Sequence, residues 1–117
     1  MKNRRSFIVG IKSIRLLSKE ISFLRKYKPW GVILFSRNIK NIQQTIKLTT
    51  SIRKIFNDNN YPILIDQEGG RINRLDNIIS FDNLTSEYFG KRFKKNFKEF
   101  VFIYKLFIDK TSYLLKS

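Results

Sequence analysis

The chain has 117 residues, of which 42% are hydrophobic and 28% are charged. This balance is typical of one small globular domain and not of a disordered chain. The chain contains no cysteine and no histidine, which excludes disulfides, thiolate metal sites and every catalytic device built on Cys or His. Any chemistry must therefore use Asp, Glu, Lys, Arg, Tyr, Ser or Thr.

The charge is strongly positive, with 24 Lys and Arg against 9 Asp and Glu and a formal net charge of +15. Such a charge is compatible with a polyanionic partner, either nucleic acid or an anionic membrane. It is also what an AT-rich genome produces, because such genomes raise Lys, Asn and Ile everywhere. The basic residues are scattered along the sequence and form no stripe, so we favour the second explanation.

No apolar run approaches the roughly 18 residues that a membrane-spanning helix needs. The segment Asn3–Ile11 carries two arginines before a short apolar run, but a secretory signal needs about 7–15 apolar residues and a cleavage site. We therefore expect a cytoplasmic protein without a membrane partner.

The first half of the chain alternates between strand and helix patterns. Residues Phe7–Ile11 form a short apolar run that predicts a buried strand. Ser18 stands where the N-cap of a helix belongs, and Pro29 ends that helix. Gly31–Phe35 is almost continuously apolar, which is typical of a parallel strand covered on both faces.

The next segment begins with a helix that Asn41 caps, with Gln44 at the spacing of a capping box. Its predicted apolar face comprises Ile42, Ile46, Leu48, Ile52, Ile55 and Phe56. A third strand is predicted over Pro62–Ile65, followed by a polar loop that runs to Gly90. The apolar spacing from Phe93 onward then predicts one long amphipathic helix.

Strands that alternate with helices imply an α/β fold with a parallel sheet. In such sheets, functional residues gather at the carboxyl ends of the strands. The most informative end is Asp66-Gln67-Glu68-Gly69-Gly70-Arg71, with Arg74 shortly after it. By spacing alone, Asp66 and Glu68 could form a glycosidase carboxylate pair, or each could belong to a surface ion pair. Gly69 and Gly70 could make a sharp turn or admit a ligand close to the backbone.

Two segments carry a resemblance to a known family. The strand Gly31-Val32-Ile33-Leu34-Phe35-Ser36-Arg37-Asn38, followed about 30 residues later by Ile65-Asp66-Gln67-Glu68-Gly69-Gly70-Arg71, resembles glycoside hydrolase family 3. The resemblance is greatest to the bacterial cytoplasmic β-N-acetylglucosaminidases of cell-wall recycling. It implies a partial TIM-type (β/α)8 barrel, of which residues 1–117 are a single N-terminal fragment with the first three βα units. A whole barrel takes about 250 residues.

The resemblance also implies roles for individual residues. The family uses the acid at Asp66 to bind hydroxyls of a terminal N-acetylglucosamine, and the arginine at Arg74 to bind substrate. Glu68, Gly69, Gly70 and Arg71 shape the motif loop. The implied reaction is retaining hydrolysis of a terminal β-linked N-acetylglucosamine from muropeptide-type sugars in peptidoglycan recycling, with no cofactor and no metal.

The family's nucleophilic aspartate and its His-Asp acid/base pair lie further along the chain than these 117 residues reach. The resemblance therefore assigns no catalytic residue here, and we expect the 117-residue chain to be inactive alone. Three strands would leave two open sheet edges, which favours self-association. The alternative function is a small basic α/β protein that binds nucleic acid without catalysis, supported by Lys91-Arg92-Phe93-Lys94-Lys95; we expect no specific nucleic-acid partner.

Overall fold

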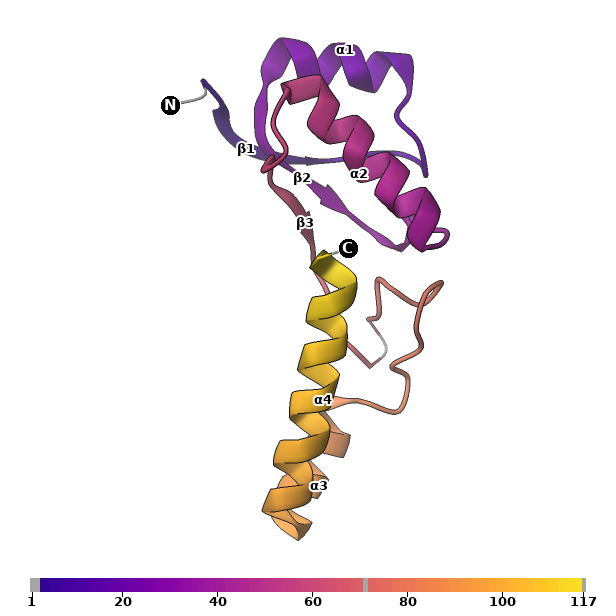
Figure 1. Ribbon diagram of the computed structural model, residues 1–117, viewed down its shortest axis with the longest axis vertical. Coiled ribbons are helices and arrows are strands. Elements are labelled where there is room, and N and C mark those ends of the chain that lie inside the picture. Colours follow the sequence, from indigo (N-terminus) through magenta and orange to yellow (C-terminus); the bar gives the residue numbers. More distant parts are fainter. Residues whose placement is uncertain (1–2, 71, 117) are drawn as a thin grey trace. The chain divides into compact units, whose positions relative to one another are not determined.

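The structure is a computed structural model that describes residues 3–70 and 72–116 (Figure 1). The chain folds into two compact units, one comprising the residues up to Gln67 with Arg74–Ser80, the other Glu68–Asn73 with the residues from Phe81 on. In chain order the elements are β1 (Arg5–Gly10), α1 (Ser18–Tyr27), β2 (Pro29–Leu34), the 3₁₀ turn η1 (Ser36–Asn38), α2 (Ile42–Phe56), β3 (Ile63–Ile65), α3 (Ser86–Lys95) and α4 (Phe97–Lys116).

The first unit is built on a three-stranded parallel sheet in the order β1-β2-β3. Val32 of the central strand is level with Val9 on one side and with Ile63 on the other. The predicted parallel α/β arrangement of these three strands is confirmed. The carboxyl ends of all three strands consequently lie at one end of the sheet, which is called the carboxyl edge below and is distinct from the outer strands.

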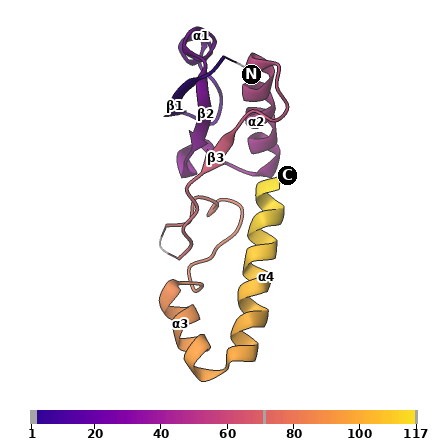
Figure 2. The same cartoon turned by 90° about the vertical axis from the view of Figure 1, so that its left-hand side faces the viewer.

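Helices α1 and α2 pack against the same face of the sheet (Figures 1 and 2). Between the sheet and the helices lies one apolar core, made of Ile11, Leu24, Val32, Leu34, Leu48, Ile52 and Tyr61. Val32 and Ile52 are completely buried. Because side chains alternate along a strand, Ile8 faces away from this core, and it is 45% exposed.

Helix α1 begins one residue before the sequence predicted, with Leu17 and not Ser18 as its N-cap. The side chain of Leu17 cannot accept a hydrogen bond, and Glu20 in the first turn supplies the capping contacts. Its carboxylate accepts hydrogen bonds from the backbone N–H groups of Leu17 and Lys12, both at 2.8 Å. A negative group in the first turn also stabilises the helix dipole. The helix ends at Tyr27, and Lys28 adopts a left-handed conformation directly before Pro29.

Helix α2 has the predicted cap, in which the Asn41 side chain accepts a hydrogen bond from the Gln44 N–H at 2.9 Å. The Gln44 side chain accepts from the Lys40 N–H, which completes the box one residue further out than the standard pattern. The predicted apolar face is wrong at its start: Ile42 and Ile46 are over 40% exposed. At 100° per residue these two point well away from the buried residues Leu48 and Ile52.

The second unit contains two helices where the sequence predicted a loop to Gly90 and one long helix. Thr85 caps α3 through its side chain, which accepts from the Tyr88 N–H, and Asn96 separates α3 from α4. Gly90 lies inside α3, where one glycine costs only about 1 kcal/mol. Phe89 is buried at 8% exposure, and its ring contacts those of Phe100, Tyr104 and Phe107. This aromatic packing outweighs the cost of the glycine.

No helix within the described ranges is both long enough and apolar enough to cross a membrane.

One buried amide joins the ends of the first two strands. Asn38 is fully buried, and its side-chain nitrogen donates to the carbonyls of Ile11 and Ser13 at 3.1 and 3.0 Å. Its side-chain oxygen accepts from the Phe35 N–H at 2.9 Å. The backbone carbonyl of Asn38 in turn accepts a hydrogen bond from the side-chain nitrogen of Gln44 in α2. The buried amide is thus fully hydrogen-bonded and fixes the loops at the carboxyl edge of the sheet.

Tyr61 closes the opposite end of the core. It is 2% exposed, its hydroxyl donates to the Pro29 carbonyl at 2.9 Å, and its ring stacks on Phe56 at 3.9 Å between centroids. Burial raises the pKa of the Tyr61 hydroxyl from 10.0 to about 12, while the nearby Arg4 guanidinium opposes this shift. The neutral phenol is therefore the form that the folded chain stabilises.

This shift predicts a loss of stability at alkaline pH. Since the folded pKa lies above the unfolded one, the stabilisation is complete below about pH 10 and disappears as the pH rises to about 12. We expect it to amount to about 2–3 kcal/mol of unfolding free energy. Chemical denaturation between pH 8 and 12 would measure it, with Tyr61→Phe as the comparison. If the variant loses the same stability over this interval, the prediction is wrong, because lysine titration alone would then account for the loss.

Candidate functional site

The candidate site lies at the carboxyl edge of the sheet in the first unit. The strands β2 and β3 run level to their ends, where Leu34 is paired with Ile65. The residues that follow, Phe35 and Asp66, are therefore neighbours at this edge. Asp66 is the first residue past its strand, as predicted, and its side chain is exposed.

Arg74 returns to this edge from later in the chain. Its backbone N–H donates to the side-chain oxygen of Gln67 at 2.9 Å, and its Nε donates to the carbonyl of Asp66 at 3.3 Å. The guanidinium carbon is 5.6 Å from the centre of the Phe35 ring. The structure thus brings Arg74 next to Asp66, but the contact is with the backbone of Asp66.

The carboxylate of Asp66 is left available for a ligand. Among residues 3–70 and 72–116, no hydrogen bond or ion pair engages its oxygens. An exposed carboxylate beside a positioned guanidinium can accept hydrogen bonds from the hydroxyls of a polar ligand, while the guanidinium donates.

Arg37 is a second cation at this edge, and the sequence interpretation assigned it no role. Its guanidinium carbon lies 4.5 Å above the Phe35 ring, and its Nε donates to the Ile11 carbonyl at 3.2 Å. The Phe35 ring is therefore contacted by two guanidinium groups, those of Arg37 and Arg74, each within cation–π distance. The signal was present in the sequence as an aromatic residue and an arginine directly after a buried strand.

The two motif glycines lie in the second unit and make a turn. Gly69 and Ile72 exchange two backbone hydrogen bonds, at 3.0 and 3.2 Å. Gly69 and Gly70 both have positive φ, 85° and 56°, a conformation that costs other residues about 1–2 kcal/mol. A Cβ at Gly70 would also lie 3.1 Å from the Thr85 side chain. Of the two uses the sequence left open for the glycines, these contacts favour the turn.

The remaining motif residues can be placed only in part. Glu68 is exposed and belongs to the same unit as the glycine turn, whereas Asp66 belongs to the first unit. Arg71, expected to shape this loop, lies outside the described residues. The carboxylate-pair interpretation of Asp66 and Glu68 therefore gains no geometric support.

Comparison with curated proteins places these features in a family context, although no family model matches the chain. A β-hexosaminidase of Alkalilimnicola ehrlichii is 41% identical over 69 residues, which are 57% of this chain and 19% of that protein. A β-hexosaminidase of Haemophilus influenzae is 37% identical over 71 residues, 59% of this chain and 19% of that protein. The chain thus spans about a fifth of the length of these relatives.

Solved structures agree with the sequence matches. NagZ from Neisseria gonorrhoeae, crystallised with N-trifluoroacetyl-D-glucosamine, matches 65% of this chain and 21% of its own at 34% identity and a TM-score of 0.55. A glycoside hydrolase family 3 β-N-acetylglucosaminidase from a Paenibacillus species matches 64% of this chain and 15% of its own at 26% identity and a TM-score of 0.57. Over the matched residues, the chain is similar in sequence and in fold to glycoside hydrolase family 3 β-N-acetylglucosaminidases, and the resemblance inferred from the two motifs is confirmed.

Proposed function

We propose that this chain supplies the first three βα units of a glycoside hydrolase family 3 barrel, as a single N-terminal fragment of that domain. The observation that carries the proposal is that Asp66, the first residue of the motif, directly follows β3, in a chain similar to β-N-acetylglucosaminidases. The winding of the sheet supports it. Strand order β1-β2-β3 with α1 and α2 on one face continues in one direction, as a barrel requires, whereas a doubly wound sheet has helices on both faces.

The proposed ligand is a terminal β-linked N-acetylglucosamine of a muropeptide-type sugar, met in the cytoplasm during peptidoglycan recycling. Asp66 accepts hydrogen bonds from sugar hydroxyls, and Arg74 donates to them. The exposed, unengaged carboxylate of Asp66 and the anchored backbone of Arg74 suit these roles. By the family resemblance, Glu68, Gly69, Gly70 and Arg71 are the residues that shape the motif loop.

We predict that the 117-residue chain alone does not hydrolyse an aryl β-N-acetylglucosaminide. It contains no histidine, and loss of general acid catalysis alone typically costs about 10²–10⁴-fold in rate. Release of nitrophenol from the aryl glycoside is the measurement, with a full-length relative as the positive control. Turnover that copurifies with the chain and disappears in Asp66→Ala or Glu68→Ala would contradict the prediction and restore the carboxylate-pair interpretation.

Sugar binding can be tested separately from catalysis. We predict that N-acetylglucosamine binds weakly to the chain and that Asp66→Ala lowers the affinity by about tenfold or more, since a hydrogen bond to a charged group contributes about 1.5–3 kcal/mol. Ligand-detected NMR titration is the measurement. The matched control is Asp76→Ala, which removes another exposed carboxylate from the same unit. Equal binding by the Asp66 and Asp76 variants would remove Asp66 from the site.

We also propose that copies of this chain associate through the open edges of the sheet. The outer strands β1 and β3 each pair with β2 on one side only. An unpaired edge presents backbone N–H and C=O groups to another strand. Size-exclusion chromatography with light scattering over a range of concentrations measures this association.

The alternative function, nucleic-acid binding, rests on the charge of +15 and on the basic cluster of α3. Within that cluster Lys91 is paired with Glu87 and Arg92 with Glu99 at 2.8 Å. The pairing also lowers the pKa of Glu87, mainly through its hydrogen bond with Lys91. These two ion pairs reduce the number of cations that are free for phosphates.

We therefore predict non-specific, salt-sensitive binding of DNA or RNA. Affinity should fall steeply as salt is raised from 50 to 200 mM, because only counterion release drives such binding. Fluorescence anisotropy with oligonucleotides of unrelated sequence is the measurement. A dissociation constant below about 10⁻⁸ M at physiological salt with a clear sequence preference is characteristic of specific binders. That result would make nucleic-acid binding the main function.

A further inference from the structure

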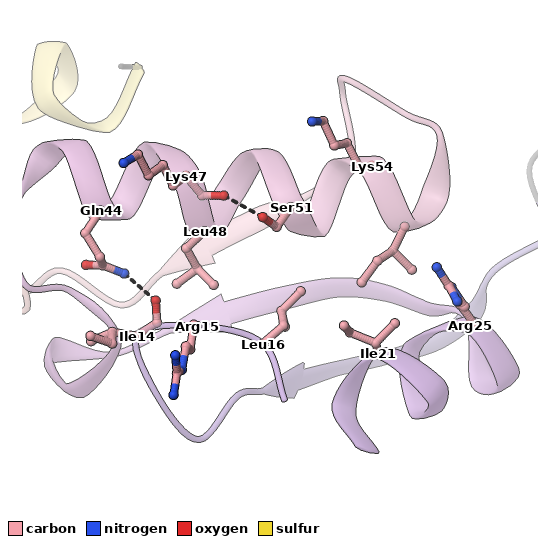
Figure 3. A pocket seen from close by; sticks show the side chains of 11 residues that line it. Ile14, Arg15, Leu16, Ile21, Arg25, Gln44, Lys47, Leu48, Ser51 and Lys54 are labelled. Atoms are coloured by element: carbon pink, nitrogen blue, oxygen red, sulfur yellow. Dashed lines mark hydrogen bonds between the residues drawn. The ribbon is translucent and has the colours of Figure 1, made fainter. Parts of the chain in front are cut away.

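A groove runs between α1 and α2, and none of its lining residues belongs to the candidate sugar site. It has a volume of about 590 Å³, and its apolar lining comprises Ile14, Leu16, Ile21, Leu48 and Ile55. Figure 3 shows the side chains of Leu48, Leu16 and Ile21 between the two helices. A floor of this kind favours an occupant with an apolar face.

Four cations border this floor. Lys47 and Lys54 stand on α2, and Arg15 and Arg25 lie on the opposite side of the groove (Figure 3). All four are exposed, and the ion pairs found among the described residues involve none of them. No described lining residue is acidic. A neighbouring cavity of about 540 Å³ shares Arg25 and Ile55 and adds Lys28, so the positive border continues toward the end of α2.

Stabilisation of the helix dipoles explains only part of this positive charge. Arg25 and Lys54 lie in the last turns of α1 and α2, where a cation stabilises the helix dipole. Lys47 lies near the middle of α2, and Arg15 lies in the loop before α1. Those two do not stabilise a helix dipole, yet they border the same apolar floor of the groove.

We propose that this groove binds an acidic amphipathic α-helix of a partner protein. An apolar stripe would lie on the floor, and carboxylates on both flanks would meet the two cationic borders, a helix-in-groove mode of recognition. Lys47 and Lys54 are seven residues apart, which is two turns and about 10.5 Å along α2. Acidic residues at positions i and i+7 of the partner repeat at the same interval.

Other occupants fit less well. A nucleic acid needs the cations but has no use for five aliphatic side chains on the floor. A small anion needs cations that converge on one point, whereas these lie on opposite borders of an open groove. A second copy of the chain fits this groove less well, since α2 contains no acidic residue that could meet the cationic borders.

The test uses the full 117-residue chain and a fluorescent synthetic helix with Leu at i, i+3, i+4 and i+7 and Glu on both flanks. We expect this peptide to bind with a micromolar dissociation constant that weakens with salt. A peptide with Gln in place of every Glu should bind at least about tenfold more weakly. Equal binding of the two peptides would overturn the proposal.

Charge reversal in the groove locates the site. We expect Lys47→Glu with Lys54→Glu to weaken binding of the acidic peptide by about 30-fold or more, and Arg15→Glu alone by several-fold. The matched control is Lys105→Glu with Lys110→Glu, which makes the same change of charge on exposed residues of α4. If the control weakens binding equally, only net charge matters and the groove is not the site.

Two further ligands complete the test. An oligonucleotide or a phosphatidylserine vesicle that binds the wild-type chain, loses affinity in the Lys47/Lys54 double variant and keeps it in the control variant would assign the groove to that ligand and overturn the proposal. If neither the oligonucleotide nor the vesicle displaces the acidic peptide, the result supports the proposal. Circular dichroism of each variant verifies that the helices are retained.

Discussion

The carboxyl edge of the sheet depends on the buried amide of Asn38. Its side chain makes three hydrogen bonds, two to carbonyls after β1 and one to the N–H after β2. Each buried polar group that lost its partner would cost about 1–3 kcal/mol. Because the same residue holds Gln44 at the start of α2, the loops at this edge and the helix that follows them have one fixed arrangement. Arg37 and Phe35, which flank the candidate site, are set in place by it.

The candidate sugar site and the cationic groove use different parts of one small unit. The site lies at the carboxyl ends of the strands. Asp66 directly follows β3 there, and Arg74 contacts the backbone of Asp66 from the loop that follows. The groove uses the outer layer, where α1 and α2 leave aliphatic side chains uncovered between them. A strongly basic composition affects the two differently. It supplies positioned guanidinium groups at the edge of the sheet, and it gives the groove borders of a single sign.

Much of the first unit was predictable because its signals are local. The Asn41 cap with Gln44 follows from a few neighbouring residues and is confirmed. The strand predicted over Gly31–Phe35 is found at Pro29–Leu34, and the loop predicted after Ile65 is present but ends before Gly90, where α3 begins at Ser86. The parallel order of the strands follows from the alternation of strands and helices. The start of α1 was mispredicted because Glu20 caps the helix from inside, so that the residue at the cap position needs no polar side chain. Gly90 was mispredicted because the packing of Phe89 against α4 is not visible in the local sequence.

The sequence by itself determined the residue chemistry and the family resemblance. It excluded histidine and cysteine mechanisms, and the family resemblance that its motifs carry implies sugar binding at Asp66 and Arg74. Only the tertiary structure decided how these residues meet. Arg74 is anchored by Gln67 and the Asp66 backbone, Arg37 shares the Phe35 ring with it, and Asn38 is buried and not solvated. The physical reason is that a hydrogen bond or a ring contact depends on distance in space, whereas sequence patterns report only the periodicity of neighbours along the chain.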